Sequence, residues 1–181
     1  WKQGPGIDFT EALGDLPLVA EDLGLLSPGV DLLRKQAGLP GMSVLQFGFS
    51  NPENNPHHPS QITPDRIAYS GTHDNDTVKG WLSQASDAEK ANLRACVGEW
   101  SEGHLAIAQA TLDSPAICAI IAAQDLLGLG SEARFNTPGK AEGNWTWRMT
   151  DAHMNNLFAQ ASTWRKMLKH AQRTNALNDG I

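Results

Sequence analysis

The sequence has little cysteine and no excess of basic residues, and these shortages exclude several classes of protein. Only two of its 181 residues are cysteines, Cys96 and Cys118, and each lies in an apolar setting. We interpret them as buried free thiols rather than as a disulfide, without the surroundings of a reactive thiolate. The formal net charge is −6. Binding to nucleic acid or to an anionic membrane therefore has no electrostatic support.

Long apolar runs and several common motifs are also missing. The longest uncharged apolar stretch, "SPAICAIIAAQ", is too short to cross a bilayer. No secretory signal is visible, so we expect a cytoplasmic protein. No strand candidate is followed by a glycine-rich phosphate-binding motif, and there is no G-x-S-x-G elbow for a serine hydrolase triad. The remaining class is an ordinary globular protein, at 40% hydrophobic and 19% charged residues, with a length that suits one domain.

Short and nearly continuous apolar runs are the main structural signal in the chain. They resemble strands buried on both faces of a parallel sheet and cover residues 16–20, 42–47, 66–71 and 116–123. Helix signals, among them Ser27-Pro28 and a Ser86/Glu89 capping box, alternate with these runs. The helices that we expect cover residues 28–38, 87–97, 101–112 and 151–171.

The spacing of the strand ends indicates repeated βα units. Glu21 and Phe47 are 26 residues apart and Phe47 and Asp74 are 27 apart, whereas the 51 residues from Asp74 to Asp125 leave room for two extra helices. Either an open doubly wound sheet or part of a (β/α)8 barrel fits this pattern. In both folds functional sites gather at the carboxyl ends of the strands, where Glu21 and Asp74 stand.

Two of the predicted strands finish in charged residues, which suggests acid/base chemistry. A carboxylic acid beside apolar neighbours at a buried strand end can keep its proton near neutral pH, and this suits Glu21 as a general acid. Asp74 stands between His73 and Asn75, a polar setting that favours its ionised form. One protonated and one charged carboxyl group is the division that glycoside chemistry uses. The alternative is structural: Glu21-Asp22 would cap a helix and "THDNDT" would be a hydrogen-bonded turn.

A metal site is a second alternative. His73, Asp74 and Asp76 could hold an ion in a metal-dependent hydrolase. The nearest further histidines, His57 and His58, have no ligand spacing and lie in a Pro- and Asn-rich segment that we interpret as an exposed loop. We therefore expect neither a metal nor a cofactor.

A long loop over residues 124–149 follows the fourth predicted strand. Loops of this length commonly shape a binding site. Trp145 and Trp147 in this loop would suit stacking on sugar rings or, equally, packing.

Four motifs in this order resemble one family. "AEDLG", "GMSVLQFGF", "GTHDNDT" and "QDLLGLGSEARFNTPG" followed by "GNWTWR" are similar to the carboxyl-terminal part of the 4-α-glucanotransferases, also called amylomaltases or disproportionating enzymes. The resemblance covers nearly the whole chain. It implies an α/β fold, the carboxyl-terminal half of a (β/α)8 barrel (strands 5 to 8) with added helices. Residues 1–181 would be a partial catalytic domain acting on maltooligosaccharides and other α-1,4-glucans.

The resemblance also assigns roles to residues. It implies that Glu21 is the general acid/base, that Asp74 stabilises the transition state and that His73 hydrogen-bonds the sugar. Phe47 and Asn136 would line the glucan groove, and no metal or cofactor is implied.

One element of the family pattern is not in this sequence. The family's nucleophile is an aspartate in an Arg-x-Asp-His segment, which the chain does not contain. We expect that segment upstream of Trp1, and we expect the chain to be a fragment that is inactive alone. A glucan-binding fragment without catalysis is the remaining alternative, and the oligomeric state is open.

Overall fold

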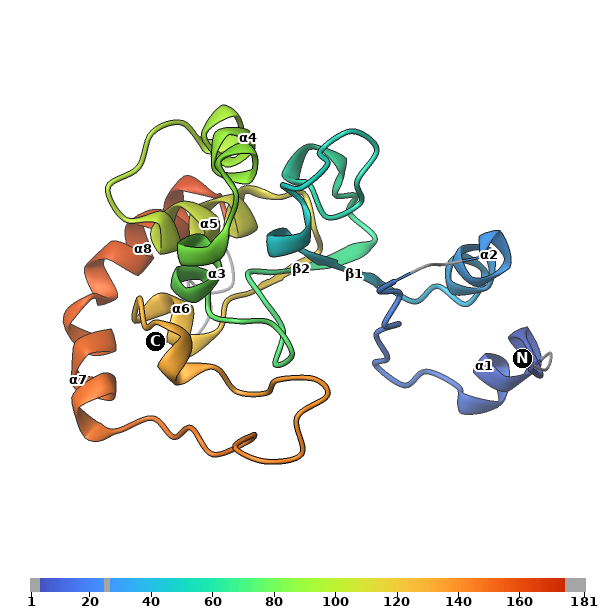
Figure 1. The fold of residues 1–181 in the computed structure, drawn as a ribbon. Coiled ribbons are helices and arrows are strands. Elements are labelled where there is room, and N and C mark those ends of the chain that lie inside the picture. Colours follow the sequence, from blue (N-terminus) through green and yellow to red (C-terminus); the bar gives the residue numbers. More distant parts are fainter. Residues whose placement is uncertain (1–3, 25–26, 175–181) are drawn as a thin grey trace.

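A three-stranded parallel sheet forms the centre of the molecule (Figure 1). The computed structural model describes residues 4–24 and 27–174. The strands β1 (Gly41–Val44), β2 (Arg66–Tyr69) and β3 (Cys118–Ile120) are ordered β1-β2-β3, with Gly41 opposite Arg66 and Ile67 opposite Cys118. Because all three run in one direction, their carboxyl ends meet at one edge of the sheet. The predicted α/β class with a parallel sheet is confirmed.

The strand that we predicted over residues 16–20 is wrong. The segment is extended, but the only ladder-like bond found in its described residues runs from the Ala20 N–H to the Pro40 carbonyl, at 2.9 Å. The N–H groups of Leu16 and Leu18 instead bond to carbonyls two residues earlier in the chain. Nor is the run buried, since Leu16 is 53% exposed. An apolar run becomes a strand only when a neighbouring backbone completes its hydrogen bonds.

Helices surround the sheet unevenly. Figure 1 shows α1 and α2 apart from the other helices, beyond the β1 edge. The α-helices of the described residues are α1 (Ile7–Leu13), α2 (Pro28–Gln36), α3 (Val78–Gln84), α4 (Asp87–Val97), α5 (Gly103–Asp113), α6 (Ala123–Leu126), α7 (Asp151–Ala159) and α8 (Ala161–His170). Short 3-10 turns are η1 (Leu45–Phe47), η2 (Pro59–Gln61) and η3 (Ser131–Ala133).

Helix signals in the sequence correctly predict α2, α4 and α5, but α1, α3 and α6 were not predicted individually. In α4 the Ser86 Oγ accepts a bond from the Glu89 N–H, and the Glu89 carboxylate accepts one from the Ser86 N–H, so the capping box is formed. α2 begins at Pro28 and is followed by Gly38 at φ 65°. Three helices, α3 to α5, fill the long step from β2 to β3, as its length indicated.

The helix predicted over residues 151–171 is in fact two. Gln160, with φ −88° and ψ 1°, separates α7 from α8. After this break α8 packs against α5, with Trp164 and Leu168 beside Met167. We attribute this break to packing against α5, which the local pattern of the sequence cannot predict.

The main core lies between the sheet and the α3–α5 layer. Leu45, Phe49, Val78, Leu93 and Ile107 are fully buried there. This core fixes β2 and α3, and hence the segment that joins them. None of the helices described is long and apolar enough to cross a membrane.

Two expectations about burial need correction. Cys96 and Cys118 are free, as predicted, but both are exposed, because Cys96 lies at the surface of α4 and Cys118 on the edge strand β3. The loop of residues 51–60 is not simply exposed: the ring of His57 is half-buried, and its Nδ1 accepts a bond from the Val44 N–H at 3.2 Å. This bond ties the loop to the end of β1.

Candidate functional site

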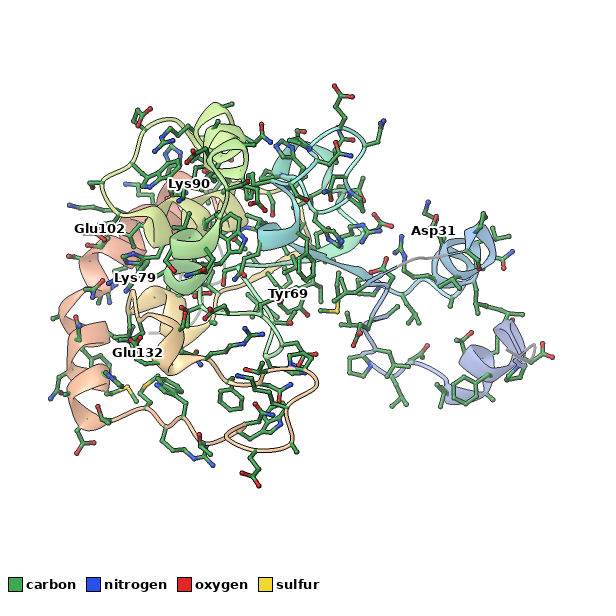
Figure 2. The ribbon with its side chains drawn as sticks, in the orientation of Figure 1. Asp31, Tyr69, Lys79, Lys90, Glu102 and Glu132 are labelled. Atoms are coloured by element: carbon green, nitrogen blue, oxygen red, sulfur yellow. The ribbon has the colours of Figure 1, made fainter. Side chains whose placement is uncertain are left out.

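A cavity of about 330 Å³ lies beside the sheet and joins the two charged strand ends that the sequence singles out. Glu21, His73 and Asp74 all line it. The rest of its wall comes from Leu23, Met42, Tyr69, Gly71, Thr72 and Ile120. Tyr69, the last residue of β2, is labelled in Figure 2. Residues 53 positions apart in the chain thus face one space at the carboxyl edge of the sheet.

Glu21 is exposed at this cavity, and Asp22 beside it is buried. The burial that we expected for Glu21 is therefore wrong, because alternate side chains of an extended segment point to opposite sides. Asp22, 4% exposed, accepts a bond from the Met42 N–H at 2.7 Å. Together with the Ala20–Pro40 backbone bond, this contact holds the Glu21 segment against β1.

Two arginines neutralise the buried Asp22 carboxylate. Its Oδ2 lies 3.0 Å from Arg66 Nη2 and 3.5 Å from Arg34 Nε. Arg34 also pairs with Asp65 at 2.8 Å, where bonds from Thr63 and then Arg34 lower the pKa of the Asp65 carboxyl to about 2. Removing one charged member would leave its buried partner without a counter-charge, which is costly. The positions of these side chains are therefore strongly constrained.

The polar segment after β2 folds into a compact turn. The side-chain carbonyl of Asn75 accepts bonds from both the N–H and the hydroxyl of Thr72, at 2.9 and 2.8 Å. His73 and Asp74 stand at the exposed side of this turn, with His73 Nε2 3.4 Å from Asp74 Oδ1. The expected hydrogen-bonded turn therefore forms, and it presents both side chains to the cavity.

The long loop after β3 closes over this turn. Asn136 Nδ2 donates to Asp74 Oδ1 at 2.5 Å, and Arg134 Nη2 donates to the Asp74 carbonyl at 2.8 Å. The Trp145 ring lies 5.1 Å from the His73 ring and meets Phe135 edge-on at 5.0 Å. Trp145 is nevertheless half exposed. It both packs on His73 and keeps a free aromatic surface.

The other predicted site residues have different positions. Asn136 contacts Asp74 directly but does not line the cavity. Phe47 ends η1, 43% exposed, with its ring edge-on to His57 at 5.5 Å, and it is also outside the cavity wall. Trp147 stacks on His153.

Sequence reasoning did not identify Tyr69 as a wall residue of the cavity. Burial, followed by the nearby Cys118, raises the pKa of Tyr69. Its place at a strand end beside the charged turn was the available signal.

The metal alternative finds no geometric support in the residues described. No group of three or more His, Cys, Asp or Glu side chains there could hold an ion. Asp76 is not part of the wall of this cavity, and its carboxylate accepts bonds from Ser131 Oγ, at 2.7 Å to Oδ2, and from the Thr77 N–H to Oδ1.

Comparison with known proteins identifies one family. Residues 1–155 match the family model described as 4-alpha-glucanotransferase. The chloroplastic/amyloplastic 4-alpha-glucanotransferase of Arabidopsis thaliana is 41% identical over 175 residues, which are 93% of this chain and 30% of that protein. The 4-alpha-glucanotransferase of Thermus thermophilus is 40% identical over 162 residues, covering 82% of this chain and 32% of that protein.

A solved structure extends the likeness to three dimensions. The amylomaltase of Streptococcus agalactiae, determined in complex with acarbose, superposes with a TM-score of 0.83 at 30% identity, over 100% of this chain and 36% of that chain. The chain thus spans about a third of the length of the relatives that it matches. By its sequence motifs, its fold and these matches, the chain belongs to the 4-alpha-glucanotransferase family.

Proposed function

We propose that this chain supplies the acid/base half of a retaining 4-α-glucanotransferase, which moves α-1,4-glucan segments between maltodextrins. In this proposal residues 1–181 are part of a catalytic (β/α)8 barrel and contribute its strands 5 to 8. The observation that carries the proposal is the shared cavity of Glu21, His73 and Asp74 at the carboxyl edge of a parallel sheet. A cytoplasmic location stays a prediction.

Glu21 acts as the proton carrier of the reaction. An aspartate from the part of the protein outside this chain attacks the anomeric carbon, while Glu21 donates a proton to the glycosidic oxygen of the departing glucan. Glu21 then accepts the proton of an incoming 4-hydroxyl group, whose oxygen displaces the aspartate. The exposed position of Glu21 at the cavity gives both glucans access to its carboxyl group.

Asp74 and His73 hold the sugar at the cleavage point. The Asp74 carboxylate binds sugar hydroxyls more strongly as positive charge develops at the anomeric carbon. His73, held by the Trp145 ring, offers a nitrogen to the same sugar. Asn136, bonded to Asp74 Oδ1, fixes the rotamer of that carboxylate. No step requires a metal or a cofactor.

Replacement of Glu21 by glutamine tests the proposal. In the longer protein that contains this chain, Glu21→Gln keeps the side-chain shape but removes the transferable proton. We expect transfer from maltotriose to fall by about 10²–10⁴-fold or more, with maltodextrin binding retained. Glu53→Gln, at an exposed position of the 51–60 loop, is the matched control and should leave the rate unchanged.

The same assay separates the outcomes. Near wild-type transfer by Glu21→Gln would remove Glu21 from its role. Binding of maltodextrin by the wild-type protein without any transfer would favour the glucan-binding alternative.

A further inference from the structure

Asp125 is a buried carboxylate that the proposed reaction does not use. It lies in α6, shortly after β3, and is 2% exposed. Its Oδ2 accepts a bond from Ser70 Oγ at 2.6 Å, and its Oδ1 accepts one from the Val78 N–H at 2.7 Å. Burial raises the pKa of Asp125, and these two bonds oppose that rise. Burying a carboxylate costs free energy, so we expect its hydrogen bonds to serve a structural or functional purpose.

The two donors bracket the segment that carries His73 and Asp74. Ser70 directly follows β2, and Val78 is the first residue of α3, so residues 71–77 run from one oxygen of the carboxylate to the other. Ser70 Oγ also accepts a bond from the Ala122 N–H at 3.3 Å, next to the end of β3. One carboxylate therefore ties both ends of the turn to α6, which follows the third strand.

We propose that Asp125 is a positioning residue, which sets the place of His73 and Asp74 by holding together the two ends of the 71–77 turn. This inference rests on the proposed function for its consequence in catalysis. Asp125 does not line the cavity with Glu21, so it acts through the turn rather than on the sugar.

The surroundings of the turn explain why its ends matter. A second cavity of about 230 Å³ lies against the turn and is lined by His73, Asp76, Asp125 and Phe135, among others. Because a cavity rather than packed side chains adjoins this side of the turn, hydrogen bonds contribute to its shape there. Gln46 Nε2 adds one, to the Asp76 carbonyl at 2.9 Å.

A carboxylate suits this task better than an amide. Both Ser70 Oγ and the Val78 N–H are donors in the observed arrangement, and a carboxylate offers an acceptor oxygen to each. An asparagine offers one oxygen, so the Ser70 hydroxyl would have to reverse and accept from the amide nitrogen. We therefore expect Asp125→Asn to hold the two ends of the turn in part, and Asp125→Ala to leave them unconnected.

The first test follows the turn itself in the 181-residue chain, by hydrogen exchange of the amides of residues 71–77. In Asp125→Ala these amides should exchange about 10-fold faster than in the wild type, with Asp125→Asn in between. Glu89→Ala is the control: it removes the capping box of α4 and lowers global stability without touching the turn. If the turn exchanges no faster in Asp125→Ala than in Glu89→Ala, the inference is overturned.

The second test is kinetic and uses the longer protein. Asp125→Ala should lower kcat by about 10- to 100-fold with little change in KM for maltotriose, because misplacement of about 1 Å costs this much. Glu89→Ala should leave kcat unaltered at a temperature where it is folded, and an unaltered kcat in Asp125→Ala would overturn the inference. If the wild-type protein has no transfer activity, the proposed function fails, and the exchange comparison alone decides the role of Asp125.

Discussion

Asp74 is held by its neighbours rather than by burial. Its carboxylate accepts a bond from Asn136 Nδ2 at 2.5 Å and lies 3.4 Å from His73 Nε2, yet half of the side chain is exposed. The bond from Asn136 goes to Oδ1 and leaves Oδ2 free of it, and Asp74 is part of the cavity wall. The second oxygen can therefore bind a sugar hydroxyl while the first keeps its bond from Asn136.

Replacing Asp74 by asparagine tests this reading. We expect Asp74→Asn in the longer protein to lower kcat and kcat/KM together, by about 10²–10³-fold, because the lost interaction strengthens mainly in the transition state. Steady-state kinetics with maltotriose measure both constants. Asp151→Asn, at the start of the distant helix α7, serves as the control. A change confined to KM would mean that Asp74 only binds the ground-state sugar.

The sequence predicted that Glu21 and Asp74 face one site, but not how their neighbourhoods are buried. The motif positions of Glu21 and Asp74 led to one cavity, but which of Glu21 and Asp22 is buried depends on how the extended segment is turned. The anchoring of Asp22 by Arg34 and Arg66 has no local signature, since its partners lie 12 and 44 residues away.

At the scale of elements, local signals succeeded where the cause of the structure is local. The capping box of α4 and the proline start of α2 are interactions within a few residues, and both were predicted. The strand over residues 16–20 and the single helix over 151–171 failed because a distant partner decides each. Trp145 and His73 are 72 positions apart in the chain, so the periodicity of the sequence could not predict their contact either.

The loop of residues 51–60 should make stability depend on pH. Burial, followed by the charge of Arg66, lowers the pKa of His57 from its ordinary value of 6.5, so the folded protein binds its proton less readily than the unfolded chain. Stability is therefore full above pH 6.5 and falls as the pH drops through 6.5 toward the lowered pKa. A protonated Nδ1 could not accept the Val44 bond.

Replacing His57 by glutamine, a neutral side chain with an acceptor oxygen, should reduce this dependence. Urea unfolding at pH 5 and pH 7 measures it: the loss of stability on going to pH 5 should be smaller in His57→Gln than in the wild type. The interval from pH 7 to pH 8 is the internal control, where the two should change in parallel. Equal losses at pH 5 would show that His57 is not the responsible group.

At the scale of the whole molecule, the segment that contains α1 and α2 exposes several large apolar side chains. Its large exposed side chains include Phe9, Leu16, Val19, Val30 and Leu32. An apolar surface of this kind, next to an edge strand, favours association. In relatives roughly three times as long, further chain is available to cover such a surface.

We therefore predict that the 181-residue chain alone associates with itself and has no transferase activity. Retention needs two carboxyl groups about 5–5.5 Å apart across the scissile bond, and the proposal draws one of them from outside this chain. Sedimentation measures association, and chromatography of the products from maltotriose measures transfer. Glucose and longer maltodextrins formed in proportion to the purified chain would contradict the prediction and require a nucleophile among its own residues.

The bonds of Asp125 also set an order of events during folding. They join groups 55 and 47 residues apart in the chain, and both partners precede Asp125. Contacts of such separation form only after the intervening chain has closed into a loop, which slows their appearance. During synthesis on a ribosome, β1, β2 and the helices α3 to α5 can assemble while the turn with His73 and Asp74 is still loose. Sugar-binding competence should thus arrive late, when β3 and α6 dock, and a nascent chain halted before residue 125 would be compact yet unable to shape its site.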